Sequence, residues 1–427
     1  MKLSYLSNLL VVSIADCQTN KWVEYGHDGS IVLTHPELPK YFGTREVKFD
    51  PDQQFDAIFA SFTDLSKSIS TFANSPAVSG RKSLRGQFDE EFAAYQVMLA
   101  NRQESNADPA YGSYVVDHVS HRLFMIMPEY WHRLGLVTNN GNLILNPENS
   151  LRWHEVREKL EKLVVGVAGV SVGGNILEGV CREIRPKMIK IADLDWIELT
   201  NLNRLNRGNA LSLTLPAAQR QHARNPYEMN RLSKAEFTAY QQQLVDPYAD
   251  WYVYKEGLDS TNIHQFLDGN DCEPALDIVI EEVDDLALKV ELREECRKRR
   301  VPVIMISDFG HRVLVQVHDY RRYPDSLLGY NVPDAELKEK LRRAIETGNR
   351  TAIFEFVAAL CGEDYAKDEV GRFIAGEDEQ PTSSLPQSGA TALVAGGVGA
   401  KIVWQYCLGY ELPERFAIDL KHYQVDK

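Results

Sequence analysis

A glycine-rich turn follows an apolar run at 163–170, and a helical pattern begins directly after it. Small residues let the backbone turn sharply and approach a phosphate, and the N-terminus of the following helix offers free N–H groups to the anion. The turn therefore predicts a phosphate-binding loop, although glycines at such turns also occur for packing. The residues that we assign to this loop are Gly169, Ser171, Gly173 and Gly174.

Two aspartates, Asp193 and Asp195, lie at the end of the next predicted strand, 188–193. An acidic residue at this place can accept hydrogen bonds from the ribose hydroxyls of a nucleotide. This feature supports a nucleotide ligand but does not separate ATP from NAD. A bare aspartate at a strand end is otherwise a helix cap or a turn former.

Asn201 and Arg204 follow within the segment 193–205, which reads DLDWIELTNLNRL. Hydride transfer needs no guanidinium next to the ribose carboxylate. An adenylating enzyme does need positive charge there, because it must hold a triphosphate and stabilise the charge that develops on pyrophosphate. The segment therefore favours ATP over NAD.

Four acidic residues lie in the run 281–285, EEVDD, at the end of another predicted strand. Carboxylates packed together repel one another unless a cation lies nearby, and their oxygens suit Mg²⁺ that is shared with phosphates. The six cysteines contain no Cys-x-x-Cys pair, so we expect no structural zinc.

The spacing from Asp193 to Arg204 resembles the signature of the ThiF/MoeB/HesA family, bacterial relatives of ubiquitin-activating enzymes. That signature is a Gly-rich turn followed by D-x-D-x-V-x-x-S-N-L-x-R-Q. The resemblance implies that Asp193 holds the ribose, that Arg204 and Lys234 bind the phosphates, and that Asp284 holds Mg²⁺. Lys234 lies further along the chain than is usual, which implies an insertion near 208–228; an exposed helix lysine is the alternative for it.

The resemblance also implies a reaction. A carboxylate would attack the α-phosphorus of Mg·ATP to give an acyl-adenylate and pyrophosphate, and the acyl group would then pass to an amine or thiol. The carboxylate would belong to a peptide, a ubiquitin-like protein or a small molecule. A homodimer is implied, and so is a separate nitroreductase-like partner, because the chain looks most like a bacterial subgroup associated with such domains.

Some residues depart from the family pattern. Ser171 and Val172 stand where many members have two glycines. Cys361 lies where a sulfur nucleophile could occur, but its neighbours Glu363 and Asp364 are acidic, so we expect a buried apolar cysteine. Two alternative functions therefore stay open. They are an NAD(P)-dependent oxidoreductase and a nucleotide-binding protein without turnover.

Strand and helix patterns alternate from residue 163 onward, and this order predicts an α/β fold with a doubly wound, mostly parallel, Rossmann-like sheet. We expect residues 1–150 to form an α+β region of unknown role and residues 151–427 to form the ThiF-type adenylation domain. The predicted strands are 163–170, 188–193, 277–283, 301–307 and 416–420, and the predicted helices are 173–184, 286–300 and 394–409.

The composition limits the partners. A formal net charge of −14 repels phosphate backbones and anionic lipid, so we expect neither nucleic acid nor a membrane surface as a partner. Scattered cysteines fit a reducing compartment, and we expect a cytoplasmic protein. The first fifteen residues are mostly apolar, and a buried strand explains them better than a signal peptide does.

Overall fold

The computed structural model describes residues 9–25, 30–42, 44–49, 92–97, 100, 112–117, 122–126, 153–213, 232–366 and 387–426. The chain divides into two compact units, Ser7–Val156 and Arg157–Lys427. The predicted insertion near 208–228 lies mostly outside the described residues.

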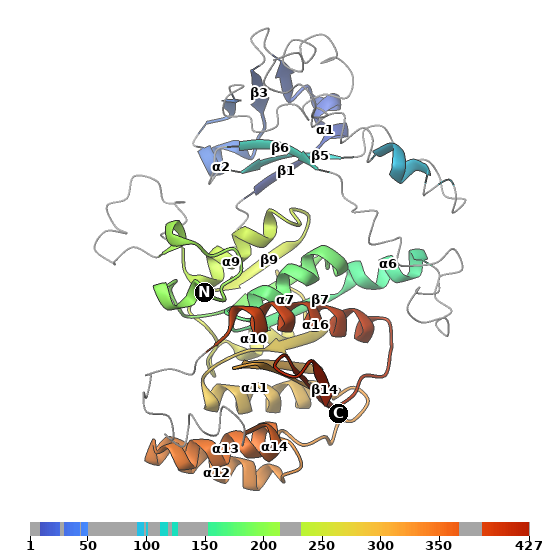
Figure 1. The fold of residues 1–427 in the computed structure, drawn as a ribbon. Helices are drawn as coiled ribbons and strands as arrows, with labels where there is room; N and C mark the ends of the chain where they lie inside the picture. Colours follow the sequence, from blue (N-terminus) through green and yellow to red (C-terminus); the bar gives the residue numbers. More distant parts are fainter. Residues whose placement is uncertain are drawn as a thin grey trace. The chain divides into compact units, whose positions relative to one another are not determined.

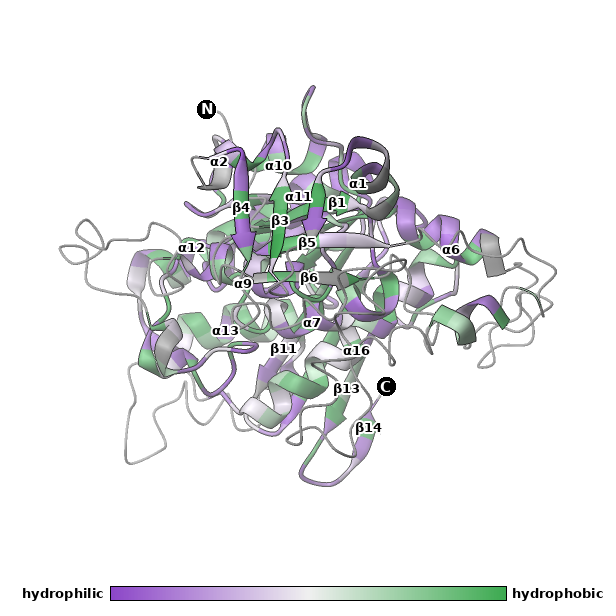
Figure 2. Ribbon diagram, turned by 90° about the horizontal axis from the view of Figure 1, so that it is seen from above, coloured by the Kyte–Doolittle hydropathy of each residue, from purple (hydrophilic) through white to green (hydrophobic). Residues whose placement is uncertain are grey.

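Within its described residues, the first unit contains two antiparallel sheets of three strands each (Figure 1). Its first predicted strand ends early, because the Ser13 hydroxyl accepts a hydrogen bond from Asp16 N over 3.0 Å and begins a helix. The buried side chains Ile31 and Leu33 lie on β3, which Figure 2 shows in the green of hydrophobic residues. The elements of this unit are β1 (Leu9–Ser13), α1 (Ile14–Asn20), β2 (Val23–Tyr25), β3 (Ile31–Thr34), α2 (Leu38–Phe42), β4 (Glu46–Phe49), β5 (Ser113–Asp117) and β6 (Arg122–Ile126).

The second unit contains an eight-stranded sheet in the order β14-β13-β12-β11-β10-β7-β8-β9. The five strands from β11 to β9 are parallel to one another, and the remaining three continue the sheet antiparallel. The predicted α/β fold with a doubly wound, mostly parallel sheet is confirmed. The strands are β7 (Val164–Ala168), β8 (Met188–Ala192), β9 (Asp250–Tyr254), β10 (Ile278–Glu281), β11 (Val303–Phe309), β12 (Arg312–His318), β13 (Arg415–Asp419) and β14 (Gln424–Asp426).

Helices cover both faces of this sheet. Figure 1 shows α7 and α16 on one face and α10 and α11 on the other, with α12 and α13 beyond α11. None of the helices within the described residues is long and apolar enough to span a membrane. The helices are α6 (Trp153–Lys162), α7 (Gly173–Gly179), α9 (Lys234–Gln243), α10 (Ile263–Asp268), α11 (Leu286–Arg299), α12 (Asp334–Thr347), α13 (Arg350–Cys361), α14 (Glu363–Ala366) and α16 (Gly389–Cys407).

Helix α16 lies directly against α7 because glycines line the contact. A Cβ atom at Gly179 would lie 2.5 Å from Ala400 Cβ, and one at Gly396 would lie 2.7 Å from Asn175 O. Such distances are too short for any side chain, so the Gly/Ala-rich sequence of α16 is explained by close packing against α7.

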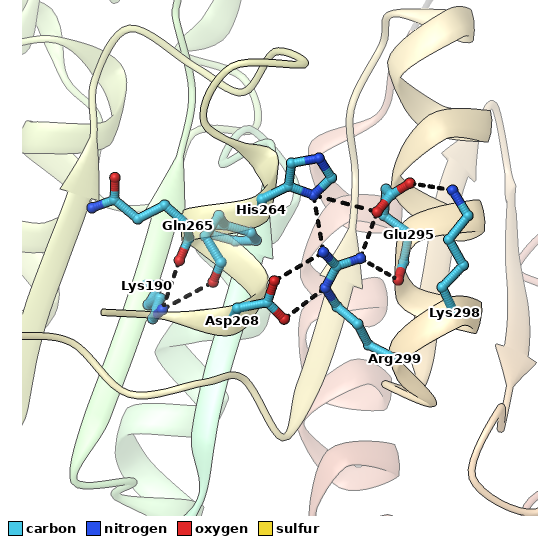
Figure 3. Close-up of polar contacts among 8 residues, drawn as sticks. Lys190, His264, Gln265, Asp268, Glu295, Lys298 and Arg299 are labelled. Atoms are coloured by element: carbon cyan, nitrogen blue, oxygen red, sulfur yellow. Dashed lines mark hydrogen bonds and ion pairs between the residues drawn. The ribbon is translucent and has the colours of Figure 1, made fainter. Parts of the chain in front are cut away.

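Polar contacts join α10 and α11 to each other and to β8 on the opposite face of the sheet (Figure 3). Arg299, the last residue of α11, donates to both carboxylate oxygens of Asp268 at the end of α10, over 2.6 and 2.8 Å. The ammonium of Lys190, buried within β8, donates to Phe266 O over 2.9 Å. These contacts hold α10 and the C-terminal end of α11 to the sheet and leave the N-terminal end of α11 to face the candidate site.

Candidate functional site

A cavity of about 530 Å³ opens at the carboxyl ends of the parallel strands. These ends are level, because Ala168 on β7 pairs with Ala192 on β8 and with Glu281 on β10. The strand order also reverses here, since β8 and β9 lie on one side of β7 whereas β10 and β11 lie on the other. Ligands of open α/β sheets bind at such a switch point, which makes this cavity the candidate site.

The turn after β7 lies tightly against the end of β10. Gly169 has a φ of +89°, and a Cβ atom there would lie 2.3 Å from Glu282 O. Only glycine combines this backbone conformation with so close an approach. Gly169 and Ser171 line the cavity, as a phosphate-binding turn requires.

Gly173 and Gly174 are buried at the start of α7 and do not line the cavity. A Cβ atom at Gly173 would lie 2.8 Å from Val167 Cγ1, so the close packing of α7 on β7 accounts for this glycine. The α-helix is shorter than predicted, because after seven residues it continues as a π-helical turn at Val180–Ile184.

Asp193 lies at the base of the cavity and holds the turn in shape. Its carboxylate accepts hydrogen bonds from Val170 N and Asp195 N, each over 2.9 Å. Burial raises the pKa of Asp193, and the positive charge of Lys234 and the two backbone amides oppose this effect.

Lys234 begins α9 and contacts both aspartates. Its Nζ lies 2.8 Å from Asp195 Oδ2 and 3.9 Å from Asp193 Oδ1. Lys234 is 3% exposed, so the alternative of an exposed helix lysine is wrong. All three residues line the cavity, which therefore holds a buried positive charge beside the turn.

Arg204 reaches the cavity from the loop that follows β8. Its Nη1 donates to Thr200 O over 2.8 Å, whereas its Nε is buried with no hydrogen-bond partner among the described residues. Asn175 on α7 holds this loop by donating from Nδ2 to Arg204 O over 2.8 Å. Asn201 does not line the cavity; its Oδ1 accepts from Glu198 N over 2.9 Å and caps a short 3₁₀ helix.

The first residue of the acidic run, Glu281, is neutralised by the protein itself. It is fully buried, and its Oε2 accepts from Arg293 Nε and Nη2 over 3.1 and 3.0 Å. Its other oxygen accepts from Lys289 Nζ. Both cations lie on α11, the helix that follows the run.

Two further residues of the run also have structural roles. Glu282 accepts from Ile306 N over 2.7 Å, and burial raises its pKa well above the usual range. Asp285 accepts from Leu288 N over 2.8 Å and caps α11. The four acidic residues therefore need no bound cation to lie together, and only Asp284 has no hydrogen bond or ion pair within the part of the chain that is described.

The donor set fits Mg²⁺ held jointly with phosphates. No group of three or more His, Cys, Asp or Glu side chains within the described ranges could hold a metal by itself. Mg²⁺ typically binds through one or two carboxylates together with water and phosphate oxygens. Asp284, exposed on the cavity wall, can supply such an oxygen.

Asp308 is a cavity residue that the sequence did not lead us to assign. Strand β11 continues three residues beyond Met305, the partner of Glu281, before it reaches Asp308. The Asp308 Oδ1 accepts from Gln387 Nε2 over 3.2 Å, and Oδ2 is buried with no partner among the described residues. Burial raises the pKa of Asp308 to about 7, with hydrogen bonding from Gln387 opposing the rise. An acidic residue directly after an apolar run was the available signal.

Helix α13 adds apolar side chains to the cavity lining. These are Ile353, Val357 and Leu360, with Arg350 at the start of the helix. Cys361 is buried at the end of the same helix, as expected, and burial raises the pKa of its thiol to about 11. The thiol therefore stays protonated at neutral pH, although it lies on the cavity wall.

Comparison with known proteins gives a partial sequence match. No family model matches the chain. An uncharacterized protein, MT1398 of Mycobacterium tuberculosis (strain CDC 1551 / Oshkosh), is 34% identical over 166 residues. This match covers 39% of the present chain and 20% of that protein.

Three solved structures are similar to the chain over more than half of its length. A crystal structure of PaaA aligns with a TM-score of 0.43 and 12% identity, covering 64% of this chain and 75% of PaaA. E. coli MccB with ATP aligns with a TM-score of 0.40 and 15% identity, covering 65% and 67%. E. coli tRNA N6-threonylcarbamoyladenosine dehydratase, TcdA, aligns with a TM-score of 0.35 and 14% identity, covering 60% and 89%. All three TM-scores lie below 0.5, so a function for this chain rests on its own cavity.

Proposed function

We propose that this chain is a ThiF/MoeB/HesA-type enzyme that uses Mg·ATP to adenylate a carboxylate. One observation carries the proposal. Four residues assigned from the sequence, Asp193, Arg204, Lys234 and Asp284, come from separate segments and line one cavity at the switch point of a parallel sheet. A hydride-transfer enzyme would account for Asp193 but not for the two cations.

In the proposed reaction, an oxygen of the substrate carboxylate attacks the α-phosphorus of ATP. The bond between this phosphorus and the pyrophosphate oxygen breaks, and the products are an acyl-adenylate and pyrophosphate. Arg204 and Lys234 stabilise the negative charge that develops on the leaving group. Mg²⁺, when held by Asp284, shields the phosphate charges.

The remaining assigned residues shape the site. Gly169 and Ser171 let the backbone approach the phosphates, and Asp193 with Asp195 binds the ribose. The buried residues behind them, Gly173, Gly174 and Asn201, position the turn and the Arg204 loop rather than touching the nucleotide.

The first experiment is calorimetry of Mg-dependent nucleotide binding. ATP, NAD⁺ and NADPH are compared on the wild type, Arg204→Ala and Asp284→Ala, with Arg342→Ala as the control because this arginine lies on the exposed side of α12. We expect ATP to bind only with Mg²⁺ and to lose at least about tenfold in affinity in both site variants, equal to roughly 1.4 kcal/mol each.

Three outcomes are distinguishable. Pyrophosphate exchange with candidate acids, added to that binding, supports adenylation. Tight binding of NAD⁺ or NADPH would replace the proposal with an oxidoreductase. ATP binding that ignores both substitutions, or that brings no exchange with any acid, would leave a nucleotide-binding protein without turnover.

The wider assignments are also proposals. We propose that residues 151–427 form the adenylation domain, that the chain is a homodimer, and that a separate nitroreductase-like chain is a partner. The acid belongs to a peptide, a ubiquitin-like protein or a small molecule. Sedimentation equilibrium tests the dimer, and a mass equal to that of one chain at micromolar concentration would exclude it.

A further inference from the structure

The cavity contains a buried acceptor atom that no residue uses. Asp308 is 3% exposed, and its Oδ1 is occupied by Gln387 Nε2. Its Oδ2 has no hydrogen-bond partner within the described ranges. Buried polar atoms are almost always paired, and an exception at a cavity is a candidate for contact with a ligand.

The surroundings of Asp308 select the ligand that would pair with it. Asp284 lies close enough to raise the pKa of Asp308 and Arg204 close enough to lower it, and no ion pair joins Arg204 to Asp308 within the described residues. In the proposed adenylation, the phosphates engage Arg204. With Asp284 holding Mg²⁺ beside the phosphates, Asp308 is the cavity carboxylate left with a free acceptor, and a carboxylate attracts an amine or ammonium and repels a thiolate.

The cysteine of the cavity is also a poor acceptor for the acyl group. Cys361 is the one cysteine that lines the cavity within the described residues, and its thiol is buried and protonated. The positive charges of Arg293 and Lys289 lower the pKa of this thiol, but burial outweighs them, so the thiol is not activated as a nucleophile requires.

We propose that the second substrate is an amine and that Asp308 Oδ2 is the general base that receives its proton. This inference rests on the proposed adenylation. The neutral amine nitrogen attacks the acyl carbon of the acyl-adenylate, the C–N bond forms, and the bond from that carbon to the AMP oxygen breaks. AMP leaves with the electron pair, the nitrogen proton passes to Asp308, and the product is an amide. A base with a pKa near 7 is well matched to this transfer at neutral pH.

The test measures both half-reactions on one preparation. Exchange of pyrophosphate into ATP, with a pool of short peptides that covers every C-terminal amino acid, reports the first. Release of AMP reports the second half-reaction. It is measured with glycinamide, an amine, and with mercaptoacetamide, in which a thiol replaces that amine. We expect glycinamide to accelerate AMP release and mercaptoacetamide to have little effect.

The substitution Asp308→Asn replaces the free acceptor at Oδ2 with a hydrogen-bond donor. Because Gln387 donates to one side of the side chain, the asparagine oxygen takes that side and an NH₂ donor replaces the free acceptor. The ratio of glycinamide-dependent AMP release to exchange should fall by about 10²–10⁴-fold, the usual contribution of a general base. Asp271→Asn, an exposed position away from the cavity, should leave the ratio at its wild-type value.

The failures are separable. Equal or faster AMP release with mercaptoacetamide, or an unchanged ratio in Asp308→Asn, overturns the amine and the role of Asp308 while adenylation stands. Absence of exchange with the peptide pool, with small carboxylic acids and with a ubiquitin-like protein means that adenylation itself has failed, and the inference fails with it.

Discussion

The buried pair between Arg293 and Glu281 gives a prediction that does not depend on function. Arg293→Met removes a guanidinium that is 0% exposed, and with it both hydrogen bonds to Glu281. Lys289 then remains as the partner of that carboxylate. The same substitution takes away the donor to Leu328 O at 2.6 Å and the contact with His318 Nε2 at 3.2 Å.

The expected loss follows from these contacts. Removing one partner of a buried ion pair costs about 3–5 kcal/mol when the other charge is left unpaired, and the retained Lys289 keeps the loss near 3 kcal/mol here. The two stranded acceptors add about 1 kcal/mol, and burial of the methionine side chain returns roughly 1–2 kcal/mol. We therefore expect Arg293→Met to lower the free energy of unfolding by roughly 2–3 kcal/mol.

Urea unfolding followed by tryptophan fluorescence measures this loss. Lys338→Met is the matched control, because Lys338 pairs with Glu294 at the surface and such pairs contribute about 1 kcal/mol or less. The double variant Glu281→Gln, Arg293→Met should lose less than the sum of the single variants, by roughly 1–3 kcal/mol. A loss for Arg293→Met as small as that of the control would refute the reasoning.

Three further predictions concern the cavity. Because the pKa of Asp308 is raised from 3.8 to about 7, the free energy of unfolding of the wild type should fall relative to that of Asp308→Asn as the pH rises from 4 to 8, by up to roughly 4 kcal/mol. A difference in unfolding midpoint between the two proteins that is the same at pH 4 and at pH 8 would contradict this. Gly169→Ala should lower the melting temperature by at least about 5 °C, whereas Gly397→Ala, where a Cβ meets nothing, should leave it equal or higher. In the folded protein at pH 7.5, iodoacetamide should label the exposed Cys272 at least about a hundredfold faster than Cys361, by peptide mass spectrometry. Faster labelling of Cys361 than of Cys272 would make Cys361 a candidate nucleophile again.

Much of the parallel sheet was predictable because its strands are covered on both faces and read as unbroken apolar runs. The predicted run 163–170 contains β7, and 188–193 contains β8. The predicted strand 301–307 stopped short, because its apolar run ends at Ile306 and polar residues follow. In the structure, antiparallel pairing with β12 extends the strand to Phe309. That pairing is a tertiary effect, and it is the reason that Asp308 was not assigned to the site.

The candidate site was predictable where its residues lie in one motif and less so where the packing of a helix decides. Asp193 and Arg204 lie eleven residues apart in one motif, and both line the cavity. The neutralisation of Glu281 depends on Arg293, twelve residues later, and on the return of α11 along the sheet. No local pattern shows that a helix will bring its cations back to a strand end.

The glycine-lined contact between α7 and α16 links two parts of the cavity. Gly396 leaves no space between α16 and the backbone of Asn175, the residue that holds the Arg204 loop. Gln387, which binds Asp308, lies two residues before α16 begins. A larger side chain at Gly396 would push α16 away from α7, and we therefore expect it to disturb the Arg204 guanidinium and the Asp308 carboxylate together.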